Sequence, residues 1–97
     1  MNGTIERPAA VAALSRREAE TLRLSALGLT DEQAAGRMGI SLGTVRVYRK
    51  RTQEKLGVKG VVRTMLVAWR LGLLDLETVA DEVAAEAGWR QATERAP

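Results

Sequence analysis

Cysteine, histidine and phenylalanine are absent from this 97-residue chain. Without cysteine or histidine, the chain has no disulfide, no thiol nucleophile, no Cys/His zinc site and no histidine general base. No paired carboxylates suggest a catalytic pocket, so we expect neither an enzyme nor a bound cofactor or metal. The only aromatic residues are Tyr48, Trp69 and Trp89. The core must therefore consist mainly of aliphatic side chains and alanine, which suits packed helices.

Long hydrophobic runs are also lacking. The most apolar stretch, residues 61–74, is interrupted by Arg63 and Arg70 and is too short to span a bilayer. The first eight residues are polar and show no secretory signal pattern. We therefore expect one small cytoplasmic domain with tails and no membrane partner.

Basic residues are concentrated in the middle of the chain. Residues 37–63 include eight basic residues and one acidic residue, whereas residues 75–97 include six acidic and two basic residues. The formal net charge of +3 therefore hides a basic centre and an acidic C-terminal end. A basic centre suits a polyanionic partner such as DNA.

Capping residues predict three helices in the first 56 residues. Ser15 with Glu18, and Thr30 with Gln33, have the spacing of a capping box. Ser41 is a favourable N-cap for a third helix. The expected helices are residues 16–27, 31–38 and 42–56. In the first of them, the residues expected inside are Leu22 and Ala26, with Leu24 and Leu27 partly covered.

The second and third helices are joined by the short turn Gly39-Ile40-Ser41, and the third helix is basic. A helix pair of this kind is a helix-turn-helix. One stripe of the third helix carries Val45 and Leu56, which would face a core, and the rest of its surface is cationic. A solvated basic face is the plain alternative to DNA binding. The preceding turn favours DNA binding.

Two further helices are expected, at residues 59–71 and 75–88. The first of them has two neighbouring apolar faces, which exceeds what one small core requires. The surplus would either contact a second subunit or, through Trp69, cover the core beneath the first helix. The residues assigned to a homodimer contact are Val61, Met65, Ala68 and Trp69.

The two ends of the chain differ in character. Residues 1–13 are expected to form a flexible N-terminal arm. Residues 75–97 are expected to form an acidic amphipathic helix and a frayed tail. This helix would pack on the domain, pair with its twin in a dimer, or dock on another protein.

Four segments occur at a fixed spacing: LSRREAE (14–20), ISLGTVR (40–46), KLGV (55–58) and GLL (72–74). Together they resemble the LuxR-type (LuxR/GerE family) helix-turn-helix DNA-binding domain, and the resemblance covers residues 14–74 without a gap. It implies an all-α fold: a compact four-helix domain, here followed by an additional C-terminal helix. The third helix of that family enters the major groove, and the fourth commonly forms the dimer contact.

The resemblance also implies roles for individual residues. Arg46, Val47 and Lys50 match positions that face base edges, which agrees with the preference of Arg and Lys for guanine. Residues at helix N-termini and on the flanks of this strip are expected to contact phosphates. The expected phosphate contacts are Thr30, Ser41, Thr44, Arg49, Arg51 and Lys55.

Some positions depart from the family pattern. Thr21, Ala34 and Thr52 stand where larger aliphatic residues are usual, at a cost of roughly 1–3 kcal/mol each if they are buried. We expect the C-terminal helix or dimerisation to compensate. Tyr48 replaces a frequent histidine and suits the core. Val61 replaces an arginine that usually supports the turn before the fourth helix.

The leading hypothesis is a sequence-specific, homodimeric bacterial transcription regulator that acts on double-stranded DNA at the nucleoid, with a recognition helix at about residues 42–56. The alternative is an interaction module that docks on RNA polymerase or another regulator through the fourth and fifth helices. A sigma-factor-like module is disfavoured by residues 55–58 and 72–74. The initial Met and the extra helix favour a stand-alone regulator over a fragment of a larger one.

Overall fold

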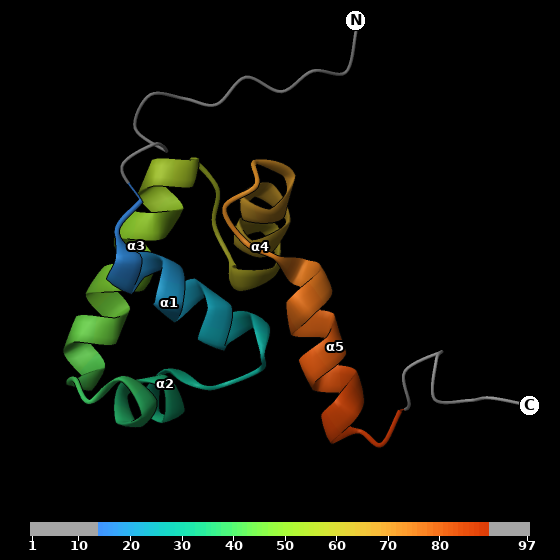
Figure 1. Cartoon of the computed structure of the whole chain (residues 1–97). Helices are drawn as coiled ribbons and strands as arrows, with labels where there is room; N and C mark the ends of the chain where they lie inside the picture. Colours follow the sequence, from blue (N-terminus) through green and yellow to red (C-terminus); the bar gives the residue numbers. More distant parts are fainter. Residues whose placement is uncertain (1–13, 90–97) are drawn as a thin grey trace, which may run out of the picture.

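The structure, a computed structural model, describes residues 14–89, and this part is all-helical with no strand. Residues 1–13 and 90–97, where we expected an arm and a tail, lie outside the described part. The all-α prediction is confirmed (Figure 1). The helices are α1 (Arg16–Ala26), α2 (Asp31–Met38), α3 (Leu42–Leu56), α4 (Val61–Arg70) and α5 (Leu76–Glu86).

The starts of the first three helices follow from local hydrogen bonding. Complete capping boxes open α1, with Ser15 and Glu18, and α2, with Thr30 and Gln33. The Ser41 hydroxyl accepts from the Thr44 amide and opens α3. These contacts satisfy amides that have no partner within the helix. Both capping boxes were predicted, and the observed bounds of α2 and α3 are those predicted from the sequence.

The turn between α2 and α3 is closed by a left-handed glycine. Gly39 has φ 69°, a conformation in which a residue without Cβ is unstrained. The amide of Ile40 donates to the Ala35 carbonyl at 3.1 Å and completes a helix-ending turn. The two helices are thereby held as a helix-turn-helix.

The fourth helix begins later than predicted, at Val61 rather than Lys59. Gly60 has φ 88° and forms the N-cap without a side-chain hydrogen bond. A chain that turns through a positive φ at Gly60 cannot already be helical at Lys59, which explains the difference. The Thr64 hydroxyl donates to the Gly60 carbonyl at 2.6 Å and supports this start from within the helix.

Two apolar clusters share α1 and α3, the central pair of helices. Leu24 of α1 and Val45 of α3 join α2 in one cluster. Leu22 of α1 and Leu56 of α3 join α4 and α5 in the other. Leu24 is only 3% exposed, so the expectation that it would be partly covered was wrong. It faces α2, because α1 is packed on two sides.

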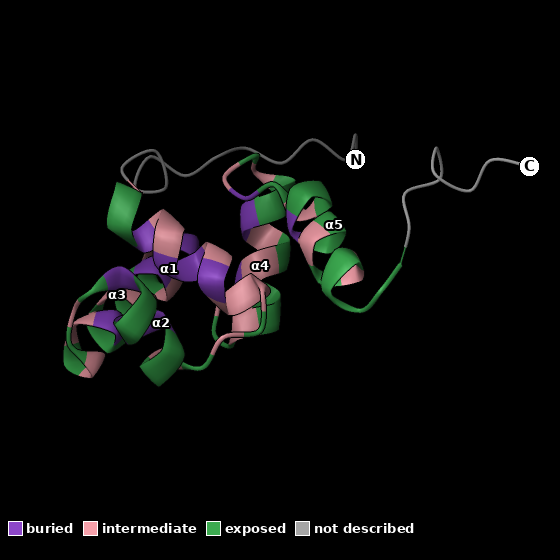
Figure 2. Cartoon of the chain, turned by 60° about the horizontal axis from the view of Figure 1, so that its bottom comes forward, coloured by how far each residue is buried: buried purple, intermediate pink, exposed green. Residues whose placement is uncertain are grey.

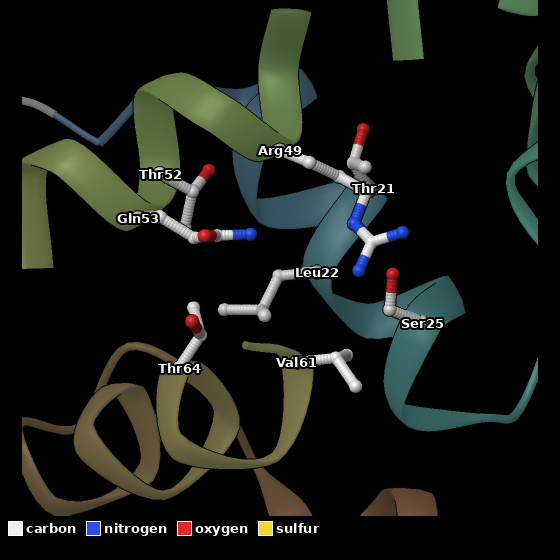
Figure 3. A pocket seen from close by; sticks show the side chains of 8 residues that line it. All are labelled: Thr21, Leu22, Ser25, Arg49, Thr52, Gln53, Val61 and Thr64. Atoms are coloured by element: carbon white, nitrogen blue, oxygen red, sulfur yellow. The ribbon is translucent and has the colours of Figure 1, made fainter. Parts of the chain in front are cut away.

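Three of the departures from the family pattern are buried: Thr21, Ala34 and Thr52 are at most 2% exposed. The Thr21 and Thr52 hydroxyls each donate at 2.9 Å to the carbonyl four residues earlier, so neither polar group is left without a partner. The two threonines line a cavity of about 10 Å³ between α1, α3 and α4 (Figure 3). That space suits about one water molecule and no larger ligand.

The fifth helix packs lightly on the rest of the domain. Of its residues, Val79 alone is buried, at 3% exposure, and it belongs to the cluster of Leu22 and Leu56. Glu82 accepts from Arg23 of α1. Figure 2 shows the remainder of α5 as half-buried or exposed. The sequence predicted an apolar stripe here, and only one turn of that stripe reaches the core.

Candidate nucleic-acid interface

Helix α3 is held by one face and leaves the other open. Val45, Thr52 and Leu56 are buried, between 0 and 8% exposed. They are spaced by seven and four residues, so they lie on one side of the helix. Lys50 and Arg51 lie on the opposite, exposed side. The 15-residue helix therefore presents a cationic surface on a rigid support.

The three residues expected to contact bases share this exposed side. The Arg46 side chain is 67% exposed, Val47 is 44% exposed and Lys50 is also exposed. Lys50 is four residues after Arg46 and three residues after Val47, so its side chain lies beside both and the three form a single short strip. A strip with two cations and one apolar side chain has the chemistry for a major-groove edge.

The N-terminus of α3 is suited to a phosphate. The Ser41 and Thr44 hydroxyl oxygens lie 2.9 Å apart, and only one of the two O–H groups is used in that contact. The other O–H can donate to an outside acceptor. The first turn of α3 contains no acidic residue, unlike the first turns of α1 and α2. The positive end of the helix dipole is thus open to an anion.

Asp31, the first residue of α2, faces two arginines of α3. Its Oδ1 accepts from Arg49 Nη1 at 2.5 Å, and its Oδ2 lies 3.9 Å from Arg46 Nε. The Arg49 side chain is 30% exposed and also lines the small cavity beside α1 (Figure 3). Asp31 was not among the site residues predicted from the sequence. Its contact with α3 depends on how the two helices meet.

Lys55, another expected phosphate contact, also meets a carboxylate. Its Nζ donates at 2.6 Å to Oε1 of Glu18, whose side chain is 3% exposed. Glu18 is the capping-box residue of α1, so this contact joins the start of α1 to the last turn of α3. The Lys55 side chain is 26% exposed. Sequence reasoning assigned the two residues separately and missed the pair.

The predicted dimer residues of α4 divide into exposed and buried ones. Ala68 is fully buried, at 0% exposure, so its assignment to a subunit contact was wrong. Trp69 is 51% exposed, so it does not simply cover the core beneath α1. Val61 and Met65 are half-buried. The outward apolar residues of α4 are Val62, Leu66 and Trp69, each between 50 and 57% exposed.

The comparisons with known proteins give a family. The model for "bacterial regulatory proteins, luxR family" matches residues 12–68, which include α1, α2, α3 and most of α4. The chain belongs to the LuxR family. Neither a curated protein nor a solved structure matches it.

Family membership gives the helix-turn-helix a general function. LuxR-family helix-turn-helix domains bind DNA and regulate transcription, so membership places this chain among DNA-binding transcription regulators. Within residues 14–89 no helix is long and apolar enough to cross a membrane. In the same range, no group of acidic side chains is arranged to hold a metal ion.

Proposed function

We propose that the chain binds double-stranded DNA sequence-specifically as a homodimer, with α3 in the major groove. The observation that carries this proposal is the two-sided character of α3: one face lies in the core, and the other exposes Arg46, Val47 and Lys50. A 15-residue helix is about 22 Å long and fits a major groove about 12 Å wide. As a DNA-bound regulator it would act in the cytoplasm, at the nucleoid.

Base contacts and phosphate contacts are divided between the exposed strip and its surroundings. Arg46 and Lys50 have the donors for guanine O6 and N7, and Val47 offers an apolar surface to a thymine methyl. Ser41 and Thr44 lie where a phosphate meets a helix N-terminus. Thr30, at the start of α2, and the exposed Arg51 complete the proposed phosphate contacts.

Lys55 and Arg49 have a different proposed role. Both side chains are at most 30% exposed, and each faces a carboxylate. We therefore propose that they hold α3 in place and that other cations contact the phosphates. The DNA-binding unit would still span residues 14–74, with residues 75–97 as an acidic C-terminal extension that supports it.

The dimer contact is assigned to the outward face of α4. Val62, Leu66 and Trp69 follow each other at steps of four and three residues, so their exposed side chains form one apolar stripe. Apolar stripes of this kind often mark protein contacts. The same stripe, with the acidic surface of α5, is also the basis of the alternative function, docking on RNA polymerase or another regulator.

The deciding experiment is selection of bound sequences from a random duplex pool at about physiological salt. An enriched inverted repeat is the expected result, and its half-site spacing would define the dimer geometry. A single enriched half-site would contradict the homodimer. If no sequence were enriched, sequence-specific DNA binding would be wrong, and the docking function would replace it.

Substitutions on α3 test the assignment of base contacts. Arg46→Ala or Lys50→Ala should cost about 1–3 kcal/mol on the selected duplex and relax its sequence preference. Arg51→Ala is the matched control: it should weaken all duplexes alike and flatten the salt dependence by about one unit of slope. Unchanged sequence preference in both Arg46→Ala and Lys50→Ala would contradict the assignment. Binding constants would be measured by fluorescence anisotropy.

A further inference from the structure

The carboxylate of Asp31 lies between Arg46 and Arg49, which are three residues apart on α3. One oxygen, Oδ1, is 2.5 Å from Arg49 Nη1, and the other, Oδ2, is 3.9 Å from Arg46 Nε. Asp31 is 22% exposed and Arg49 is 30% exposed, so this pair is partly shielded from water. The Arg46 side chain is 67% exposed. Arg49 therefore anchors the carboxylate, and the carboxylate faces the more exposed Arg46.

The geometry at Arg46 leaves its donors available for DNA. A separation of 3.9 Å is too long for a hydrogen bond, so the contact with Asp31 is a charge attraction. The contact is made through Nε, the inner nitrogen of the guanidinium. The two terminal nitrogens, which form a two-pronged contact with guanine O6 and N7, are not used by it. Asp31 thus biases the orientation of Arg46 without occupying the nitrogens that would contact a base.

The position of Asp31 also affects phosphates. It is the first residue of α2, next to Thr30, and its partners place it beside the first half of α3. A carboxylate at this place repels nearby phosphates and reduces the attraction of Arg46 and Arg49 for any duplex, whatever its sequence. If Arg46 is oriented towards one base edge and is less attracted to the DNA phosphates, its binding depends more on the base sequence of the duplex.

We infer that Asp31 is a positioning and specificity-determining residue: anchored by Arg49, it aims Arg46 at one guanine and lowers binding to unrelated DNA. This inference rests on the proposed function, since it concerns how the same helix distinguishes sequences. It also makes a particular base, guanine, the partner of Arg46.

The test compares Asp31→Asn with Glu32→Gln. Both substitutions remove one negative charge from the first turn of α2. Asp31 is the carboxylate that faces Arg46 and Arg49, whereas Glu32 is exposed. The probes are the duplex enriched by the wild-type chain, the same duplex with each guanine replaced in turn, and a duplex of unrelated sequence. Dissociation constants are measured at two or more salt concentrations.

Asp31→Asn should lower the preference for one particular guanine by about 3- to 10-fold and should tighten binding to the unrelated duplex. Glu32→Gln should tighten unrelated binding only slightly and keep every preference. Asp31→Glu, which keeps the charge, should restore part of the lost preference. In an Arg46→Ala background, Asp31→Asn should change the preference at that guanine no further, because the residue it positions is gone.

Two failures can be told apart. Suppose that the wild-type chain enriches a sequence. If Asp31→Asn then keeps every base preference, or loses no more preference than Glu32→Gln does, the inference alone is wrong. If the wild-type chain enriches no sequence, the proposed function is wrong and the inference fails with it. Asp31→Asn should melt below Glu32→Gln, because it also loses the ion pair with Arg49, but it should remain folded at the temperature of the binding measurements. A selective collapse of Asp31→Asn would make Asp31 a structural residue and overturn the inference.

Discussion

Glu18 is a buried carboxylate that connects the first helix to the third. Its Oε1 accepts from the Ser15 amide at 2.8 Å and from Lys55 Nζ at 2.6 Å. Burial acts to raise the pKa of Glu18, but the hydrogen bonds from Lys55 and Ser15 and the charge of Lys55 outweigh it and lower the pKa. Glu18 therefore stays ionised in the folded chain and orients both helix ends.

Lys55→Met should destabilise the chain because it leaves the carboxylate of Glu18 buried without its charge partner. We expect a loss of about 2–4 kcal/mol in the free energy of unfolding, measured by urea denaturation. Lys59→Met, at an exposed position, is the control and should change stability little. If Lys55→Met kept full stability but flattened the salt dependence of DNA binding, Lys55 would be a phosphate contact after all.

The same pair predicts a pH dependence. Because the pKa of Glu18 is lower in the folded chain, its contribution is fully present above the usual glutamate pKa of about 4.3 and is lost as the pH falls through the lower, folded-state value. Wild-type stability should therefore fall more steeply in this acidic range than that of Glu18→Gln, which cannot titrate there. Equal slopes in the two chains would contradict a lowered pKa.

At the scale of single elements, α4 has an inward and an outward face of different chemistry. Thr64 and Ala68 are buried, while Val62, Leu66 and Trp69 are exposed on the other side. A small residue such as Ala68 lets α4 approach its neighbours closely. The larger apolar side chains remain outside, where a second subunit can cover them.

Trp69→Glu tests the proposed dimer contact. A charge within the apolar stripe should give monomers in analytical sedimentation at concentrations where the wild-type chain is dimeric, with the helical content kept. Trp89→Glu, at a tryptophan that is 75% exposed near the end of α5, is the matched control and should stay dimeric. If the Trp69→Glu variant remained a folded dimer and the Val83→Glu variant became monomeric, the dimer interface would lie on α5 and not on α4.

At the scale of the whole molecule, α5 completes a core that has small residues at two central positions. Thr21 and Thr52 line a cavity between α1, α3 and α4, and Val79 of α5 adds a buried side chain to the neighbouring cluster. An ion pair between Arg23 and Glu82, both partly exposed, also links α1 and α5. The fifth helix therefore belongs to the same folded unit as the DNA-binding helices.

Deletion of residues 76–97 should lower the melting temperature. The lost burial of Val79 alone is worth about 1.5–3 kcal/mol, which corresponds to at least about 6 °C for a domain of this size. Deletion of residues 90–97 is the control and should change the melting temperature little. An unchanged melting temperature after the longer deletion would show that α5 contributes nothing to stability.

Much of the fold could be predicted because its determinants are local. The bounds of α2 and α3 depend on caps and on a glycine within a few residues of each helix end, and these were predicted correctly. The start of α4 was wrong by two residues, because φ at Gly60 depends on how the chain leaves the preceding helix. The burial of Leu24 and Ala68 was also misjudged, since an apolar pattern does not say on how many sides a helix is packed.

The amino-acid sequence by itself determined the helices, the helix-turn-helix and the exposed strip of Arg46, Val47 and Lys50, since capping and helical periodicity act over a few residues. The tertiary structure alone decided which charges meet. Lys55 reaches Glu18 across 37 positions of the chain, and Arg49 reaches Asp31 across 18. Partners this distant are brought together by the packing of α1, α2 and α3, because ion pairing depends on distance in space and not on separation along the chain.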